Sequence, residues 1–185
     1  MAISTIGQNG LTAPLTLTAP ILGTPASINL TNATALPASA MPAGSVIQTV
    51  FASNSAASST TSGTYGASNL QASITPTSNT NKILITISAT LSISQLSAAG
   101  FGMGVQLNRG ATPVFTDGNT FDTLYIGPYA NYIGSVRQRT PLIYLDSPAT
   151  TGSTTYTLYF AAYQGTAYVG QNSSTSFITL QEIKA

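Results

Sequence analysis

The stretch KILITISATLSIS, from Lys82 to Ser94, decides the fold. Every odd-numbered position from 83 to 93 is apolar, and every even-numbered position other than Leu84 is Lys, Thr or Ser. Because successive side chains of a β-strand point to opposite faces, this alternation gives one apolar face and one polar face. The segment therefore predicts a long strand that lies with one face against a hydrophobic core.

The same alternation continues along the rest of the chain. In residues 101–108, Phe, Met, Val and Leu alternate with Gly, Gln and Asn. A loop is predicted at 53–62 and a hairpin turn at Gln164 and Gly165. Shorter strands are predicted at 46–51, 70–74, 113–115, 142–145, 155–163, 167–169 and 177–183. Roughly eight to ten short strands, separated by turns, predict an all-β, jelly-roll-like β-sandwich over residues 45–185.

Residues 1–44 have a different character. Their five prolines are spaced too closely for a helix or a long central strand to form between them. The tetrapeptide LTAP occurs at 11–14 and again at 17–20. We expect residues 1–44 to form an extended Pro/Thr-rich N-terminal strap, used as an anchor or stalk. The alternative is a flexible tail of low complexity.

The composition excludes most enzyme mechanisms. Of the 185 residues only 5% are charged, whereas soluble domains usually have about 25%. The chain contains no His, Cys or Trp, which removes His general bases, thiol nucleophiles, Cys/His metal sites and disulfides. We therefore expect a structural or recognition protein that is not an enzyme and has no cofactor.

The distribution of charge also limits the partners. A net charge of +1 provides no general attraction to nucleic acid or to an anionic membrane. Residues 1–10 lack the basic region and the apolar core of a secretory signal, so we expect the chain not to be secreted. No apolar run reaches the ~18 residues that a membrane helix needs. Residues 2–81 contain no charged side chain. Such a surface is poorly soluble when it is free, so we expect copies of the chain to bury it in an oligomer.

The four acidic residues form no recognisable catalytic pair. We expect Asp146 to open a turn and Glu182 to be an ordinary surface charge beside Lys184. Asp117, Asn119 and Asp122 bring three oxygen side chains close together, but the bidentate Glu and the spacing of a calcium loop are missing. A turn capped by Asp and Asn is the preferred interpretation, and no metal site is expected.

A segment rich in Tyr, Asn and Gly supplies the candidate binding residues. Tyrosines in loops offer a large, rigid contact area with a polar tip, and arginines bind carboxylates through two parallel hydrogen bonds. The alternative is that these tyrosines pack at the edge of the core. The receptor-binding candidates are Tyr125, Tyr129, Asn131, Tyr132, Arg137 and Arg139.

Several longer motifs resemble one group of proteins. They are GTPASINLTNATALP at 23–37, PAGSVIQ at 42–48, SITPTSNTNKIL at 73–84, YLDSPATT at 144–151 and SFITLQEI at 176–183. Together they are similar to tail-fibre-like structural proteins of tailed bacteriophages, including those that infect cyanobacteria.

The resemblance implies a trimeric, non-enzymatic β-domain on a fibre of the virion, made in the host cytoplasm. Because residues 1–22 are too short for the shaft of a long fibre, we expect a homotrimeric short fibre of the tail, neck or head. The strap would contact other virion proteins or neighbouring straps, and the domain would contact a glycan or protein of the host surface. The alternative is a capsid decoration or cement protein with no receptor-binding role.

Overall fold

The computed structural model describes residues 37–95, 100–119, 122–127 and 134–185. These residues belong to one compact unit, Pro37–Ala185. Within the described ranges no helix is long and apolar enough to cross a membrane. Residues 1–36 of the predicted strap are outside the described residues, so the strap and its boundary at residue 44 stay predictions.

The described residues form strands joined by short connections, with two 3-10 turns. The turns are η1 (Ala38–Ala40) and η2 (Gln171–Ser173). The strands are β1 (Val46–Asn54), β2 (Ser58–Thr60), β3 (Gly66–Ile74), β4 (Lys82–Gln95), β5 (Phe101–Arg109), β6 (Thr112–Thr116), β7 (Leu124–Ile126), β8 (Gly134–Asp146), β9 (Thr154–Tyr163), β10 (Thr166–Val169) and β11 (Ser176–Ile183).

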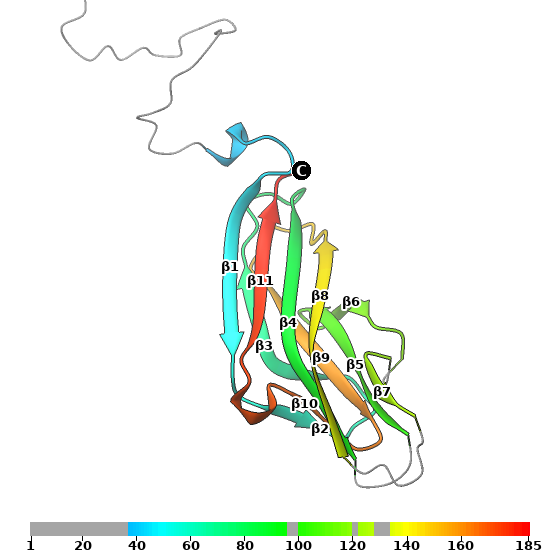
Figure 1. Ribbon diagram of the computed structural model, residues 1–185. Helices are drawn as coiled ribbons and strands as arrows, with labels where there is room; N and C mark the ends of the chain where they lie inside the picture. The colour runs from blue at the N-terminus through cyan, green and yellow to red at the C-terminus, as the bar shows by residue number, and fades with distance from the viewer. Residues whose placement is uncertain (1–36, 96–99, 120–121, 128–133) are drawn as a thin grey trace, which may run out of the picture. The chain divides into compact units, whose positions relative to one another are not determined.

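The strands build two antiparallel sheets. In sheet A, β11 lies between β1 and the first half of β4. The second half of β4 pairs on the same side with β10, which in turn pairs with β2. Strand β8 pairs with the other side of β4 along its whole length. In sheet B the order is β3, β9, β5 and β6, and β7 pairs with the beginning of β5. Figure 1 shows β1, β11, β4 and β8 in one layer in front of β3, β9 and β5. The prediction of an all-β sandwich is confirmed.

The core lies between the two sheets, and β4 contributes its apolar face as predicted. Its six odd-numbered residues from Ile83 to Ile93 are each at most 2% exposed. Phe101, Met103 and Leu107 of β5 face them and are buried to the same degree. Full burial of one such side chain contributes about 1.5–3 kcal/mol, so this set is the main source of stability.

Three strands differ from the sequence-based expectation. The predicted loop at 53–62 contains β2, because Thr60 and its neighbours pair with the edge offered by β10. Strand β8 begins at Gly134 and not at Leu142, since it pairs with β4 along its whole length, from Gln95 to Ile83. Strand β7 has only three residues, which is too few to produce a periodic pattern.

The predicted turn at Gln164 and Gly165 is present, but the prediction that it joins a hairpin is wrong, because β9 pairs with β3 and β5 in sheet B whereas β10 pairs with β4 and β2 in sheet A. Gln164 and Gly165 both have positive φ, 52° and 80°, and the chain turns here from one sheet to the other. At the opposite end of the domain, the chain entering β1 pairs with the end of β11. The amide of Gly44 donates to Lys184 O at 2.8 Å, and the amide of Lys184 donates to Ser45 O at 2.9 Å.

The expectation for Glu182 is wrong. Its side chain points into the sandwich and is fully buried. The carboxylate accepts hydrogen bonds from Gln48 Nε2 at 2.6 Å, Asn81 Nδ2 at 2.6 Å, and the amide and hydroxyl of Thr77 at 2.7 and 2.8 Å. Burial would raise the pKa of this carboxyl, but the donors together outweigh burial and lower the pKa. Glu182 therefore ties β1 and the 75–81 connection to β11.

Candidate functional site: the outer face of sheet A

The outer face of sheet A carries most of the exposed large apolar side chains of the described residues. Four of these six side chains belong to sheet A: Val46 at 45% exposure, Phe51 at 61%, Ile143 at 69% and Leu145 at 49%. The strand register puts Phe51, Thr179, Thr86 and Ile143 in one row across the sheet. The outward side of an antiparallel sheet is normally polar, so an apolar row there indicates a contact surface.

An aromatic pair lies on this face. Phe51 comes from β1 and Phe177 from the neighbouring strand β11, with the ring centres 5.8 Å apart and the ring planes tilted by 30°. Diagonal neighbours on adjacent strands are within reach of aromatic side chains, which explains why these two rings meet. The two rings together form an apolar platform, of which Phe51 is the exposed part.

Arg139 continues the platform from the opposite edge of the sheet. Its guanidinium carbon lies 5.6 Å from the centre of the Phe177 ring, within the range of a cation–π contact. The guanidinium donates to Ser88 Oγ at 3.0 Å, to Thr90 Oγ1 at 3.1 Å and to the carbonyl of Thr175 at 2.7 Å. These acceptors hold the side chain flat across β4 without neutralising its charge.

Arg137 lies two residues earlier on the same face of β8. Its Nη2 donates to Gln171 Oε1 at 3.1 Å, and the same oxygen accepts a hydrogen bond from Ser92 Oγ at 2.7 Å. The ion pair of the described residues is between Arg109 and Asp146, so neither Arg137 nor Arg139 is paired with a carboxylate there. We call Phe51, Phe177, Arg139 and Arg137 the aromatic–arginine strip.

The predicted binding residues are distributed over two faces. Tyr125 is 48% exposed on β7 and lies opposite Gly102, which pairs on its other side with Tyr163 of β9. This row belongs to the outer face of sheet B, whereas Arg137 and Arg139 belong to the outer face of sheet A. The structure therefore does not bring Tyr125 together with the arginines. Tyr129, Asn131 and Tyr132 lie outside the described residues, and their role stays a prediction.

Sequence reasoning missed the aromatic partners of the arginines. A signal was present, because Phe51 stands between Thr49 and Ser53 at the polar phase of β1. Phe177 likewise precedes Thr179 and Gln181 at the polar phase of β11. An aromatic residue at a polar phase of a strand marks an exposed ring, but only the sheet order shows that the two rings are neighbours.

The acidic residues serve local structure. Asp122 Oδ2 accepts a hydrogen bond from the amide of Asn119 at 2.8 Å, as in the capped turn that the sequence favours. Asp117 Oδ2 accepts one from Thr123 Oγ1 at 2.7 Å. Asp146 is buried at the end of β8 and accepts hydrogen bonds from Arg109 and Tyr156. Among the residues that the structure describes, no three His, Cys, Asp or Glu side chains gather as a metal site would need.

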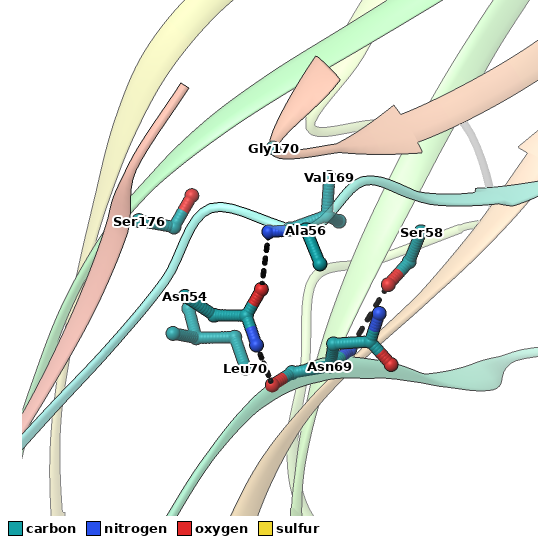
Figure 2. A pocket seen from close by; sticks show the side chains of 8 residues that line it. All are labelled: Asn54, Ala56, Ser58, Asn69, Leu70, Val169, Gly170 and Ser176. Carbon is teal, nitrogen blue, oxygen red and sulfur yellow. Dashed lines mark hydrogen bonds between the residues drawn. The ribbon is translucent and has the colours of Figure 1, made fainter. Parts of the chain in front are cut away.

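Two hollows were considered as ligand sites. The one drawn in Figure 2 has no room for a water-sized sphere, and its polar groups bind one another: Asn54 Nδ2 donates to Asn69 O, and Asn69 N donates to Ser58 Oγ. It is a packed junction between β1, β3 and β10. A cavity of about 270 Å³ lies beside β8, between Phe115, Thr140 and Ile143. Its lining comes from β8 of sheet A and from β5, β6 and the 117–123 connection of sheet B, so it lies at the edge between the two sheets.

Comparisons with known proteins give no family. No protein-family model matches the sequence. No curated protein matches it. Among solved structures, infectious bursal disease virus of the Gx strain overlaps with a TM-score of 0.37 and 12% identity, covering 76% of this chain and 39% of that chain. The VP2 subviral particle of the same virus gives 0.35 and 11%, with the same coverage.

A further overlap is with the dimeric latent PorU of Porphyromonas gingivalis. Its TM-score is 0.33 at 10% identity, and it covers 77% of this chain and 14% of that chain. The chain thus spans about two-fifths of the viral proteins and a smaller part of PorU. Overlap of this extent does not identify a shared function.

Proposed function

We propose that this chain is a structural protein of a bacteriophage virion, a homotrimeric short fibre whose sandwich domain projects from the particle and contacts the host surface. The observation that carries the proposal is the outer face of sheet A, where exposed Phe51 and Ile143 share a row and the arginines of β8 are paired with no acid among the described residues. A face of this kind suits contact with another molecule. The bacteriophage origin rests on the sequence motifs at 23–48, 73–84, 144–156 and 176–183.

A non-enzymatic role is supported by the state of the carboxylates. Each of the four acids of the chain is a hydrogen-bond acceptor in a structural contact: Asp117 with Thr123, Asp122 with Asn119, Asp146 with Tyr156 and Glu182 with Asn81. Hydrolysis of a glycosidic bond by paired carboxylates needs two carboxyl groups that face a common cleft. Buried Asp146 and Glu182 face the interior and are committed to their donors.

A trimer and an anchoring strap are supported by the charge distribution. The uncharged segment 2–81 includes β1, β2 and β3, so a large share of the domain surface lacks the charges that keep single molecules apart. The strap of residues 1–44 is proposed to bind other virion proteins or the straps of neighbouring subunits. Its backbone groups can add to the edge of a partner's sheet.

Two measurements test the proposal. The mass of the purified full chain in solution, from light scattering, is expected to equal three chains. Antibodies against the domain are expected to label virions at projecting structures. Label spread evenly over the capsid shell would favour the decoration or cement protein. A monomer in solution together with unlabelled virions would overturn both versions.

A further inference from the structure

We propose that the aromatic–arginine strip binds an acidic polysaccharide, with a sugar ring lying on exposed Phe51 and a sugar carboxylate bound by Arg137. This inference rests on the proposed function and names the ligand class of the host contact. It differs from the predicted Tyr/Arg site, because the aromatic groups come from β1 and β11 of the same sheet as the arginines.

The charge of the face selects an anionic ligand. Lys82, Arg137 and Arg139 are exposed and project from sheet A on the same side. The two acids of sheet A, Asp146 and Glu182, are 6% and 0% exposed and point inward. The outer face therefore carries positive charge that no described carboxylate on that face offsets. A ligand with spaced negative groups complements it.

The two arginines have different capacities. Arg139 already donates to four acceptors, the backbone and hydroxyl oxygens of Ser88, Thr90 Oγ1 and Thr175 O, so it acts as a fixed positive charge. Arg137 donates to one acceptor within the described residues, Gln171 Oε1. A guanidinium has five N–H donors, and most of those of Arg137 remain available for a bidentate bond to a carboxylate.

The aromatic pair selects a ring-shaped, partly apolar ligand. The C–H face of a pyranose is apolar and packs on an exposed aromatic ring. With 61% of its surface exposed, Phe51 is accessible to such a ligand, whereas the Phe177 ring is already in contact with Arg139 and supports Phe51. The hydroxyls of Thr179 and Thr86, in the same row as Phe51, offer hydrogen bonds to sugar hydroxyls. A polymer that only carries charge would make no use of the rings.

The test is calorimetric titration of the full chain with oligogalacturonate, a polymer of carboxylated sugars. Three further probes separate the contributions: a neutral maltooligosaccharide, a sulfated dextran oligosaccharide and polyglutamate. Oligogalacturonate is expected to bind at least about tenfold more tightly than the neutral sugar, a difference of ~1.4 kcal/mol. Equally tight binding of the sulfated oligosaccharide would extend the ligand class to sulfated sugars and would still support the strip as the site.

Two substitutions locate the site. Phe51→Ala is expected to weaken oligogalacturonate binding about tenfold, and Arg137→Gln about fivefold, through loss of a ring contact and of a charge-assisted bond. Tyr159→Ala, a half-buried aromatic residue on the outer face of sheet B, is the matched control and should leave binding unchanged. Circular dichroism of each variant verifies that the fold is retained.

The outcomes separate this inference from the proposed function. If polyglutamate binds as tightly as oligogalacturonate and Phe51→Ala has no effect, the face binds any polyanion through charge alone and the inference is overturned. If Phe51→Ala changes the mass of the assembly, the ring is buried between copies of the chain and the inference is also overturned. In both cases the proposed function still stands if the full chain has the mass of a trimer and antibodies against the domain label projecting fibres of the virion.

Discussion

The hydroxyl of Tyr156 donates a hydrogen bond to Asp146 Oδ2 at 2.6 Å, and this bond joins the two sheets of the sandwich. Asp146 ends β8 of sheet A, whereas Tyr156 belongs to β9 of sheet B. Arg109 of β5 completes the contact with Nη1 bonds of 3.0 and 2.8 Å to the two carboxylate oxygens. Because Asp146 and Tyr156 are buried, each polar group there needs its partner.

Removal of the Tyr156 hydroxyl should therefore destabilise the domain. We expect Tyr156→Phe to lower the free energy of unfolding by about 1–3 kcal/mol, since a buried carboxylate loses one donor while Arg109 remains. Chemical denaturation measures the difference. The control is Tyr159→Phe on the outer face of sheet B, which should change stability little. Equal stability of Tyr156→Phe and the parent chain would mean that Arg109 alone satisfies Asp146.

Tyr156 also predicts a dependence on alkaline pH. Burial, followed by the hydrogen bond and negative charge of Asp146, raises the pKa of this hydroxyl well above its usual value of 10.0. A raised pKa in the fold means that stability is complete below the pKa of the unfolded chain and is lost as pH rises above it. The free energy of unfolding should thus fall above about pH 10, and less steeply in Tyr156→Phe. Parallel pH profiles would contradict this assignment.

Glu182 predicts the opposite dependence at acid pH. Hydrogen bonds from Asn81, Gln48 and Thr77 outweigh burial and lower its pKa in the fold. Its contribution to stability is therefore present above the pKa of the unfolded chain, about 4.3, and is lost as pH falls through the lower folded value. Glu182→Gln should be less stable than the parent at neutral pH, with the difference shrinking in acid. Lys82→Gln, which alters an exposed charge, should show a constant difference.

The sequence predicted the sheets better than their contacts. The alternation in residues 82–94 fixes which side of β4 is buried, because a shift by one residue would expose six apolar side chains. Glu182 stands at the inward phase of β11, in step with Ile178 and Leu180, so the alternation could have predicted its burial. No local rule reveals that its partner is Asn81, which is far away in the sequence. Phe51 and Phe177 are similarly far apart in sequence, and only strand order makes them neighbours of Arg139.

Gly165 tests the turn between β9 and β10. Its φ of 80° is in the left-handed region, and a Cβ at this position would collide with the carbonyl oxygen of Ser94, which is backbone. We expect Gly165→Ala to lower the free energy of unfolding by more than the ~1–2 kcal/mol of the left-handed conformation alone. Gly110→Ala is the matched control, with φ of 57° and open space at its Cβ. Equal losses in the two variants would show that the turn shifts to avoid Ser94.

Substitution of Arg139 measures how much its hydrogen bonds to sheet A contribute to the stability of the domain. Lysine keeps the positive charge but cannot reproduce a planar fork that reaches Ser88, Thr90 and Thr175 together. These bonds are to neutral acceptors on an exposed face, so we expect Arg139→Lys to lower the free energy of unfolding by about 0.5–1.5 kcal/mol. Arg137→Lys, which replaces a single bond to Gln171, should have a smaller effect. Denaturation midpoints of the two variants measure the difference. A larger loss of stability in Arg137→Lys would contradict this prediction. It would mean that the contact between Arg137 and Gln171 stabilises the domain more than the contacts of Arg139 do.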